Sequence, residues 1–284
     1  MLINKHVLMS GTDYFDDGYA INAHMNDKIP VDLAVAAREH NDIADCLQKA
    51  GVVVDKVAPP QGCQDGVYTA NWGLIVGNKA ILANLPNIRE AEQPYAEAEL
   101  KRLGYQTIKL PAEVHFSGQG DALPCGNYLF VGTTYRTSPL AHNLLAKHTG
   151  FKVVNLQTVP QIDVTGNLVI NRVTNWPDSY FYDLDLALAV ITNDCIAWCP
   201  EAFVPESQEK LRALPIDKIE VSLQEAMHGF ACNLVSTGES VVMSDRAPEF
   251  RAKLEARGLK VYSPHVTELL KGGGFIRCTT LTLA

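Results

Sequence analysis

One pattern occurs five times along the chain: a polar, helix-like stretch, a helix stop, and then a short β-rich run. The five helix-like stretches are residues 31–51, 90–104, 138–150, 205–215 and 247–258. Apolar residues recur within them at the spacing of a half-buried helix, for example at Ala44, Leu47, Phe250 and Leu254. A repeat at this period is typical of folds built from copies of one unit, each of which buries its apolar face against its neighbours.

Each helix-like stretch ends in a residue that stops a helix. Gly51, Gly104, Gly150 and Gly258 hold this place in four units, and Pro215 holds it in the fourth of the five. Glycine adopts the left-handed conformation that closes many helices without the steric penalty of a side chain. The stops therefore predict a helix followed directly by a strand in each unit.

Hairpin-like stretches follow four of the units, at residues 73–83, 121–132, 186–199 and 233–244, and each contains a turn signal between two apolar runs. The fifth unit ends in CTTLTLA, and KHVLMS near the N-terminus is its expected partner strand. Such pairing would close a ring and remove the exposed edge strand. We expect a single domain over residues 1–284, a five-bladed α/β propeller of ββαβ repeats around a pseudo-fivefold axis. An α/β chain with irregular alternation is the alternative.

The charge of the chain restricts its partners. The 284 residues carry a formal net charge of −8, and the sequence pI is about 5.5. Nucleic acids and anionic membranes select basic surfaces, so neither is expected as a partner. A cationic small molecule is the expected ligand for a chain of this charge, and the sequence is also compatible with a homo-oligomer.

Other classes of protein are disfavoured by missing patterns. No apolar run approaches the length of a membrane span, and we expect no signal peptide. The seven cysteines are scattered without the paired spacing of a zinc site, which predicts free thiols in a reducing cytoplasm. Neither a phosphate-binding loop nor a dinucleotide fingerprint is present, so we expect no cofactor and no metal.

Polar residues precede the apolar hairpins at a similar number of residues after the helix stop. Asp65, Ser117 and His228 lie thirteen or fourteen residues after the helix stops of their units. Asp183 and Asp185 precede the third hairpin after a longer intervening segment, and Cys278 begins the last strand. Equivalent positions of a ring meet at its axis, so this phase predicts one central site.

Cys278 is the candidate nucleophile of that site. It follows three glycines, 272–274, which allow the backbone to approach a ligand closely. Nearby Arg277 and Lys271 are expected to lower its pKa and favour the reactive thiolate. The alternative is a cysteine that serves only in packing.

Seven sequence blocks resemble the guanidino-group-modifying (pentein) superfamily of arginine deiminases, dimethylarginine dimethylaminohydrolases and amidinotransferases. The blocks are TDYFDDGYAINAHM, QDGVYTANWGLI, FSGQGDAL, YRTS, FYDLDLAL, FACN and TELLKGGGFIRCTTLTL. The resemblance covers nearly the whole chain and is strongest to the bacterial branch that includes arginine dihydrolases.

The resemblance implies a hydrolase, or an amidinotransferase, that acts on a guanidino or ureido compound through a covalent cysteine intermediate. A guanidinium is a poor electrophile and needs a strong nucleophile, and carboxylates bind its N–H groups in pairs. By their place in the blocks, six residues are expected to bind substrate: Asp65, Asp185, Asn22, Asn71, Arg89 and Arg136. The two arginines suit a substrate carboxylate.

Two catalytic positions depart from the family pattern. Ser117 stands where the family has glutamate, and Asp183 stands where it has the acid–base histidine. No histidine lies between His148 and His228, so a shift of one residue does not restore the pattern.

Three interpretations of the departure follow. Asp183, with a relocated His115 or His228, does the acid–base work; the site binds a guanidino compound with little or no catalysis; or the reaction itself differs. Cys278, Asp183, His228 and Ser117 are therefore the candidate catalytic residues. The segment 11–30 is a candidate lid, and residues 164–177 form an insertion that has no counterpart in the family pattern.

Overall fold

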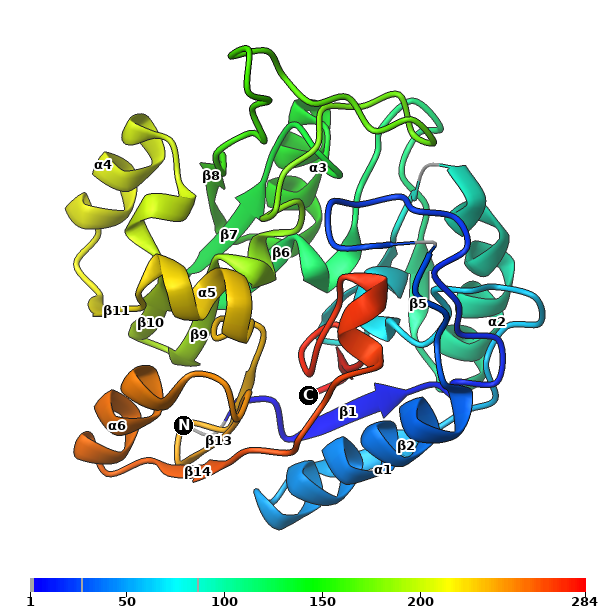
Figure 1. Ribbon diagram of the computed structural model, residues 1–284, viewed down its shortest axis with the longest axis horizontal. Helices are drawn as coiled ribbons and strands as arrows, with labels where there is room; N and C mark the ends of the chain where they lie inside the picture. Colours follow the sequence, from blue (N-terminus) through cyan, green and yellow to red (C-terminus); the bar gives the residue numbers. More distant parts are fainter. Residues whose placement is uncertain (1–2, 27, 86) are drawn as a thin grey trace.

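The computed structural model describes residues 3–26, 28–85 and 87–284. Five three-stranded sheets surround a central axis, the long helices lie on the outside, and the C-terminal segment lies at the centre (Figure 1). In each sheet an antiparallel pair is followed by a strand that runs parallel to the middle strand. The expected five-bladed α/β propeller is confirmed.

Each of the five blades contains three strands and one long helix. The strands are β15 (Leu281–Thr282), β1 (His6–Met9) and β2 (Val53–Lys56); β3 (Gly73–Val76), β4 (Lys79–Leu82) and β5 (Gln106–Ile108); β6 (Ala122–Cys125), β7 (Tyr128–Gly132) and β8 (Lys152–Leu156); β9 (Leu188–Thr192), β10 (Cys195–Trp198) and β11 (Asp217–Glu220); and β12 (Val235–Ser236), β13 (Ser240–Val242) and β14 (Lys260–Tyr262). The long helices are α1 (Leu33–Lys49), α2 (Gln93–Arg102), α3 (Pro139–Thr149), α4 (Pro205–Ala213) and α6 (Pro248–Ala256).

The helices form where the sequence predicts them because their ends and their apolar faces are specified locally. Asp32 caps α1 by accepting hydrogen bonds from the first-turn backbone amides. The four predicted stop glycines all have positive φ, the conformation that ends a helix at low cost. Ile43 and Leu47 of α1 are fully buried against the sheets.

The two ends of the chain close the ring. Strand β1 pairs with β15 in the antiparallel direction, with Val7 opposite Thr282 and Leu8 opposite Leu281. On its other side β1 runs parallel to β2. One blade is therefore shared between the first and the last strand, as the unpaired runs at the two ends of the sequence predict.

Short segments carry the chain from the outside of the ring to each inner strand. Four of them contain 3₁₀ helices: η1 (Thr69–Trp72), η3 (Gly118–Gly120), η4 (Leu184–Leu186) and η6 (Leu269–Gly272). The fourth unit differs because an additional helix, α5 (Leu223–Gly229), lies between β11 and β12. We call these approaches to the axis the entry segments. Within the part of the chain that the structure describes, no helix is long and apolar enough to cross a membrane.

Candidate active site

The entry segments of the five units meet around Cys278 at one end of the axis. They border a small pocket there, together with residues 21 and 22. The pocket is lined by Ile21, Asn22, Asp65, Tyr68, Asn71, Leu85, Arg89, Ser117, Arg136, Tyr182, Asp183, Gly272 and Cys278. Most of the predicted site residues are therefore brought together by the ring.

Cys278 is held by residues from two other entry segments. Its Sγ lies 3.3 Å from Oδ2 of Asp185 and 3.1 Å from Nδ2 of Asn233. Its backbone N–H donates to Oδ1 of Asn233 at 3.2 Å. The thiol is thus fixed in position by a carboxyl group and an amide, and it is 2% exposed.

The surroundings of Cys278 do not activate it in the unliganded protein. Burial, together with the nearby Asp185 and Asp183, raises the pKa of the thiol well above its usual value. Arg277 points its Nη2 to Gln119, and Lys271 pairs with Glu268. The expectation that Arg277 and Lys271 lower the pKa of Cys278 is therefore wrong, because burial and the carboxyl groups dominate.

Three carboxyl groups are buried near one another at the site, and one of them, Asp183, lines the pocket. Burial, and then the neighbouring Asp183, raises the pKa of Asp121 to about 7. Burial likewise raises the pKa of Asp183, and that of Asp185 is raised well above its usual value, with Asp183 adding to the effect. Charges of one sign in a site shielded from water disfavour simultaneous ionisation, so the three groups oppose one another's ionisation.

Ser117 and Asp183 occupy the two positions that depart from the family pattern, and they are linked by Asn71. Nδ2 of Asn71 lies 2.9 Å from the Ser117 hydroxyl and 2.8 Å from Oδ2 of Asp183. Oδ1 of Asp183 has no hydrogen-bond partner among the described residues. Asp183 therefore presents one oriented, unengaged oxygen in a pocket that it lines.

Asp65 and Arg89 form the side of the pocket contributed by the first unit. Burial raises the pKa of Asp65 to about 6, against the opposing effect of Arg89. All three nitrogens of Arg89 are engaged, by both carboxylate oxygens of Glu92, Oδ1 of Asn71, and backbone carbonyls. This arrangement favours a role for Arg89 in positioning Asn71. It does not favour the predicted contact between Arg89 and a substrate carboxylate.

Arg136 is the better placed of the two predicted anion-binding residues. Its Nη2 donates to the carbonyl of Ile21 at 2.6 Å, and its guanidinium lies 4.8 Å from the ring centre of Tyr182. Its Nε and Nη1 have no hydrogen-bond partner among the described residues. These donors are available to an anionic group in the pocket.

The two candidate histidines lie away from the pocket. His228 is exposed on α5 and does not line it. His115 is half-buried with its ring centre 5.0 Å from that of Trp176, and it is also absent from the lining. Counting residues from the helix stop led to His228 because α5 lengthens this part of the fourth unit relative to the other units. Counting back from the inner strand would have found Asn233, the residue that contacts Cys278.

The segment 11–30 covers the pocket, as expected of a lid; residue 27 within it lies outside the described residues. Ile21 and Asn22 line the pocket from this segment. Ring side chains hold its backbone in the pairs Tyr19–Gln64, Ala20–Asn171 and Ile21–Arg136. The lid side chains of Asn22 and His24 bond the backbone carbonyls of Gly272 and Tyr180.

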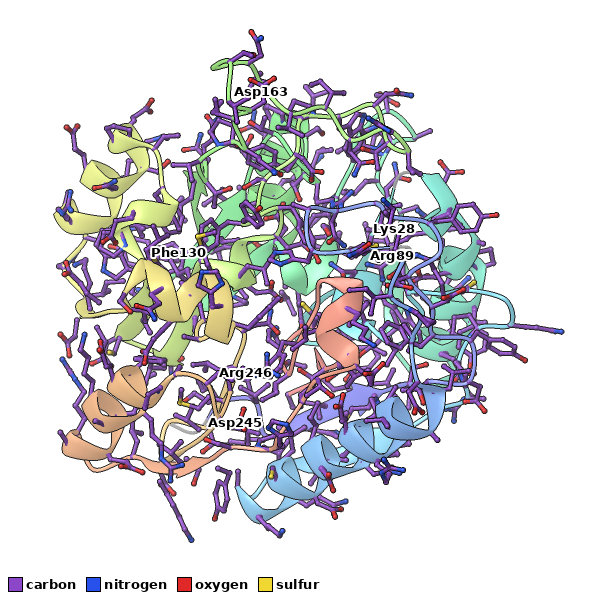
Figure 2. All side chains as sticks on the ribbon, in the orientation of Figure 1. Lys28, Arg89, Phe130, Asp163, Asp245 and Arg246 are labelled. Atoms are coloured by element: carbon purple, nitrogen blue, oxygen red, sulfur yellow. The ribbon has the colours of Figure 1, made fainter. Side chains whose placement is uncertain are left out.

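The insertion at residues 164–177 supports the lid. Asn171 donates to the carbonyl of Ala20 at 3.1 Å, and Trp176 packs on His115. Just before the insertion, Asp163 lies at the outer edge of the molecule, away from the centre of the ring (Figure 2). One side of the insertion therefore reaches the lid, while its tip faces solvent.

Comparison with known proteins agrees with this architecture. A family model described as N,N dimethylarginine dimethylhydrolase, eukaryotic, matches residues 16–284. The N(G),N(G)-dimethylarginine dimethylaminohydrolase of Mycobacterium tuberculosis is 35% identical over 281 residues, which are 98% of this chain and 86% of that protein. The chain belongs to the dimethylarginine dimethylhydrolase family. The predicted relation to the guanidino-modifying superfamily is thereby confirmed.

Other relatives of the family combine two activities in one chain. The bifunctional arginine dihydrolase/ornithine cyclodeaminase AgrE of Nostoc is 30% identical over 96% of this chain, which spans 37% of that protein. The product-bound N-terminal domain of ArgZ, a cyanobacterial arginine dihydrolase, superposes with a TM-score of 0.86 at 28% identity, covering 98% of this chain and 97% of that one. An ArgZ variant covalently bound to a reaction intermediate is equally similar. These relatives are hydrolases of guanidino compounds, in agreement with the expected reaction class.

The site offers no binding set for a metal ion. Within the described ranges, no group of three histidine, cysteine, aspartate or glutamate side chains is placed to hold one. All seven cysteines are free thiols. The pocket itself offers a thiol, carboxyl groups and amide groups.

Proposed function

We propose that this chain is a hydrolase that breaks a C–N bond of an arginine-like guanidino or ureido compound through a covalent intermediate on Cys278. The observation that carries the proposal is the position of the Cys278 thiol, which lines the pocket with Asp65 and Asp183 and lies 3.3 Å from the buried carboxyl group of Asp185. Asp65, Asp183 and Asp185 form an acidic set for a guanidinium. Arg136 would bind the carboxylate of the same molecule.

Substrate binding itself would activate the thiol. A guanidinium in the pocket would favour ionised carboxyl groups and an ionised Cys278, because an adjacent cation stabilises both anions. Asp185 is in contact with Sγ and would take its proton. The thiolate would then attack the guanidinium carbon to form a C–S bond.

Asp183 would supply the proton transfers that a histidine performs in the family pattern. In its protonated form it would donate to the departing amine as the C–N bond breaks. In its ionised form it would accept a proton from the water that attacks the intermediate, and the C–S bond would then break to regenerate the thiolate. Ser117 and Asn71 would hold Asp183 in the required orientation.

A second candidate function is binding of a guanidino compound without turnover. It is favoured by the absence of any histidine from the pocket lining and by the raised pKa of the Cys278 thiol. Amidino transfer, in which an acceptor amine replaces water, is a further variant of the same covalent chemistry. Residues 1–284 are proposed to act as one cytoplasmic domain, supported by the seven free cysteines.

The test combines intact-mass spectrometry with product assays. The protein is incubated with L-arginine, dimethylarginine and 2-chloroacetamidine, beside Cys278→Ala and the matched buried-cysteine control Cys232→Ala. An adduct and a ureido or amine product that require Cys278 but not Cys232 are expected. Asp183→Asn should lower kcat by about 10²–10⁴-fold with a smaller effect on KM.

Two other outcomes would contradict the proposal. Thermal stabilisation by one of these compounds, with neither adduct nor product, would assign the chain to the binding function. If no compound binds, the guanidino ligand class is wrong.

A further inference from the structure

A second, larger pocket lies at the opposite end of the inner hairpins from Cys278. It is bordered by the hairpin turns at Gly126 and Asn193, whereas Ser117 and Asp183 precede the same hairpins at the first pocket. Asp185 separates the two pockets, because it lines the second while its Oδ2 contacts Sγ of Cys278.

The second pocket has the composition of a small-molecule site. Its walls are mostly apolar, formed by residues such as Ile75, Leu123, Phe151, Leu188, Val190 and Leu234. Gln119, Asp185 and Arg277 also line it and are themselves buried. Sites for small organic ligands typically combine apolar walls with a few convergent polar groups.

Arg277 is a buried cation without a counter-ion. It is 6% exposed, and its hydrogen bonds go to neutral acceptors on Gln119, Thr280 and Thr282. No carboxylate of the described residues lies within ion-pair distance of its guanidinium. A buried charge that lacks a paired opposite charge is costly, and an anion beside it would offset that cost.

Asp185 lines the same pocket but lies outside ion-pair distance of Arg277. Burial and the neighbouring Asp183 raise the pKa of Asp185 well above its usual value, against the opposing effect of Arg277. Its Oδ1 is buried and has no hydrogen-bond partner among the described residues. The polar groups of the pocket therefore include the guanidinium of Arg277 and an unengaged carboxyl oxygen of Asp185.

We infer that the second pocket binds a small organic carboxylate with an apolar body. The carboxylate pairs with Arg277, whose planar guanidinium matches its two oxygens, and the body lies along the apolar walls. Asp185 then lies between this ligand and Cys278. The inference is independent of the reaction proposed for the first pocket.

The test uses phenylacetate as probe, with phenylacetamide as its uncharged analogue and phenethylamine as its cationic analogue. Binding is followed by isothermal titration to the full-length protein. Phenylacetate should bind at least about tenfold more tightly than either analogue, as expected for a desolvated ion pair. Val190→Trp, which fills the pocket from β9, should abolish binding, and Val54→Trp on β2 should leave it unchanged.

Two further variants identify the anchoring cation. Arg277→Gln should weaken phenylacetate to the affinity of phenylacetamide, whereas Arg136→Gln in the first pocket should have no effect. The opposite pattern would place the carboxylate in the first pocket and overturn the inference. Equal binding of the three probes, tighter binding of the amine, or no binding to the wild-type protein would also overturn it.

Discussion

The carboxyl groups of Asp121, Asp183 and Asp185 are buried together at the axis, so their protonation affects the stability of the fold as well as its chemistry. Each has a raised pKa in the folded protein. In the unfolded chain the same groups would titrate near the ordinary value of 3.8. Between that value and about 7, the folded state binds more protons than the unfolded state, so its stability must fall as pH rises.

Asp121→Asn tests this dependence. The unfolding free energy of the wild-type protein should fall by on the order of a few kcal/mol between about pH 5 and pH 8. The variant should show a smaller fall, because its amide cannot ionise and its oxygen can still accept from the backbone N–H of Leu184. Urea unfolding at several pH values measures the slope, and an unchanged slope in the variant would contradict the raised pKa.

At the scale of single residues, the location of a side chain close to an inner strand could be predicted from the sequence. A pKa that depends on residues from other units could not. Cys278, Asp183, Ser117 and Asp65 are found together because they lie in the entry segments, a few residues before the inner strands of a regular repeat. Cys278 itself precedes β15 and does not begin it, contrary to the expectation from sequence. The pKa of Cys278 depends instead on burial and on carboxyl groups from other units. The pKa shift of Cys278 expected from sequence neighbours such as Arg277 had the wrong sign, because their side chains are directed to other partners.

At the scale of elements, the five long helices and their hairpins are specified by local sequence. Periodicity, end residues and turn signals agree within each unit, so the predicted elements and the observed ones coincide. The exception is α5, a seven-residue helix capped by Ser222 in a unit that otherwise follows the repeat. Its insertion shifts the count that led to His228 and hides Asn233. The contact between the insertion and the lid is long-range, and no local pattern indicates it.

Asn171→Ala should loosen the lid. The change removes the hydrogen bond to the carbonyl of Ala20, and one such bond contributes about 1 kcal/mol. Amide hydrogen exchange at residues 19–22 should accelerate by roughly fivefold, without a matching change at the β-strands. Asn167→Ala, at an exposed position of the same insertion, is the control. Equal exchange in the two variants would mean that Asn171 does not hold the lid.

At the scale of the whole molecule, the ring depends on the blade that the two ends of the chain share. Its closure could be predicted because each end offered one unpaired β-rich run. The two pockets could not, since each is formed by residues from four or more units and depends on how the units pack. The entry segments meet at one pocket, and the hairpin turns border the other.

Leu281→Ala tests the contribution of the shared blade. Leu281 is fully buried opposite Leu8, so its truncation leaves a cavity that should lower the unfolding free energy by about 2–5 kcal/mol. Val53→Ala on β2 of the same blade is the control, because Val53 is 58% exposed and should cost much less. Urea unfolding compares them. Similar losses would mean that ring closure adds little to stability.

Because β1 and β15 form neighbouring strands of one blade, contacts that span nearly the entire sequence complete the fold. Within this ring a ribosome delivers β1 before β15, so the nascent fold remains an open arc until β15 has emerged. Cys278 emerges only at the end of that arc, and its contacts with Asp185 and Asn233 form as the arc closes. A truncated translation product would therefore lack its reactive thiol altogether, and chemical competence would arise together with completion of the fold.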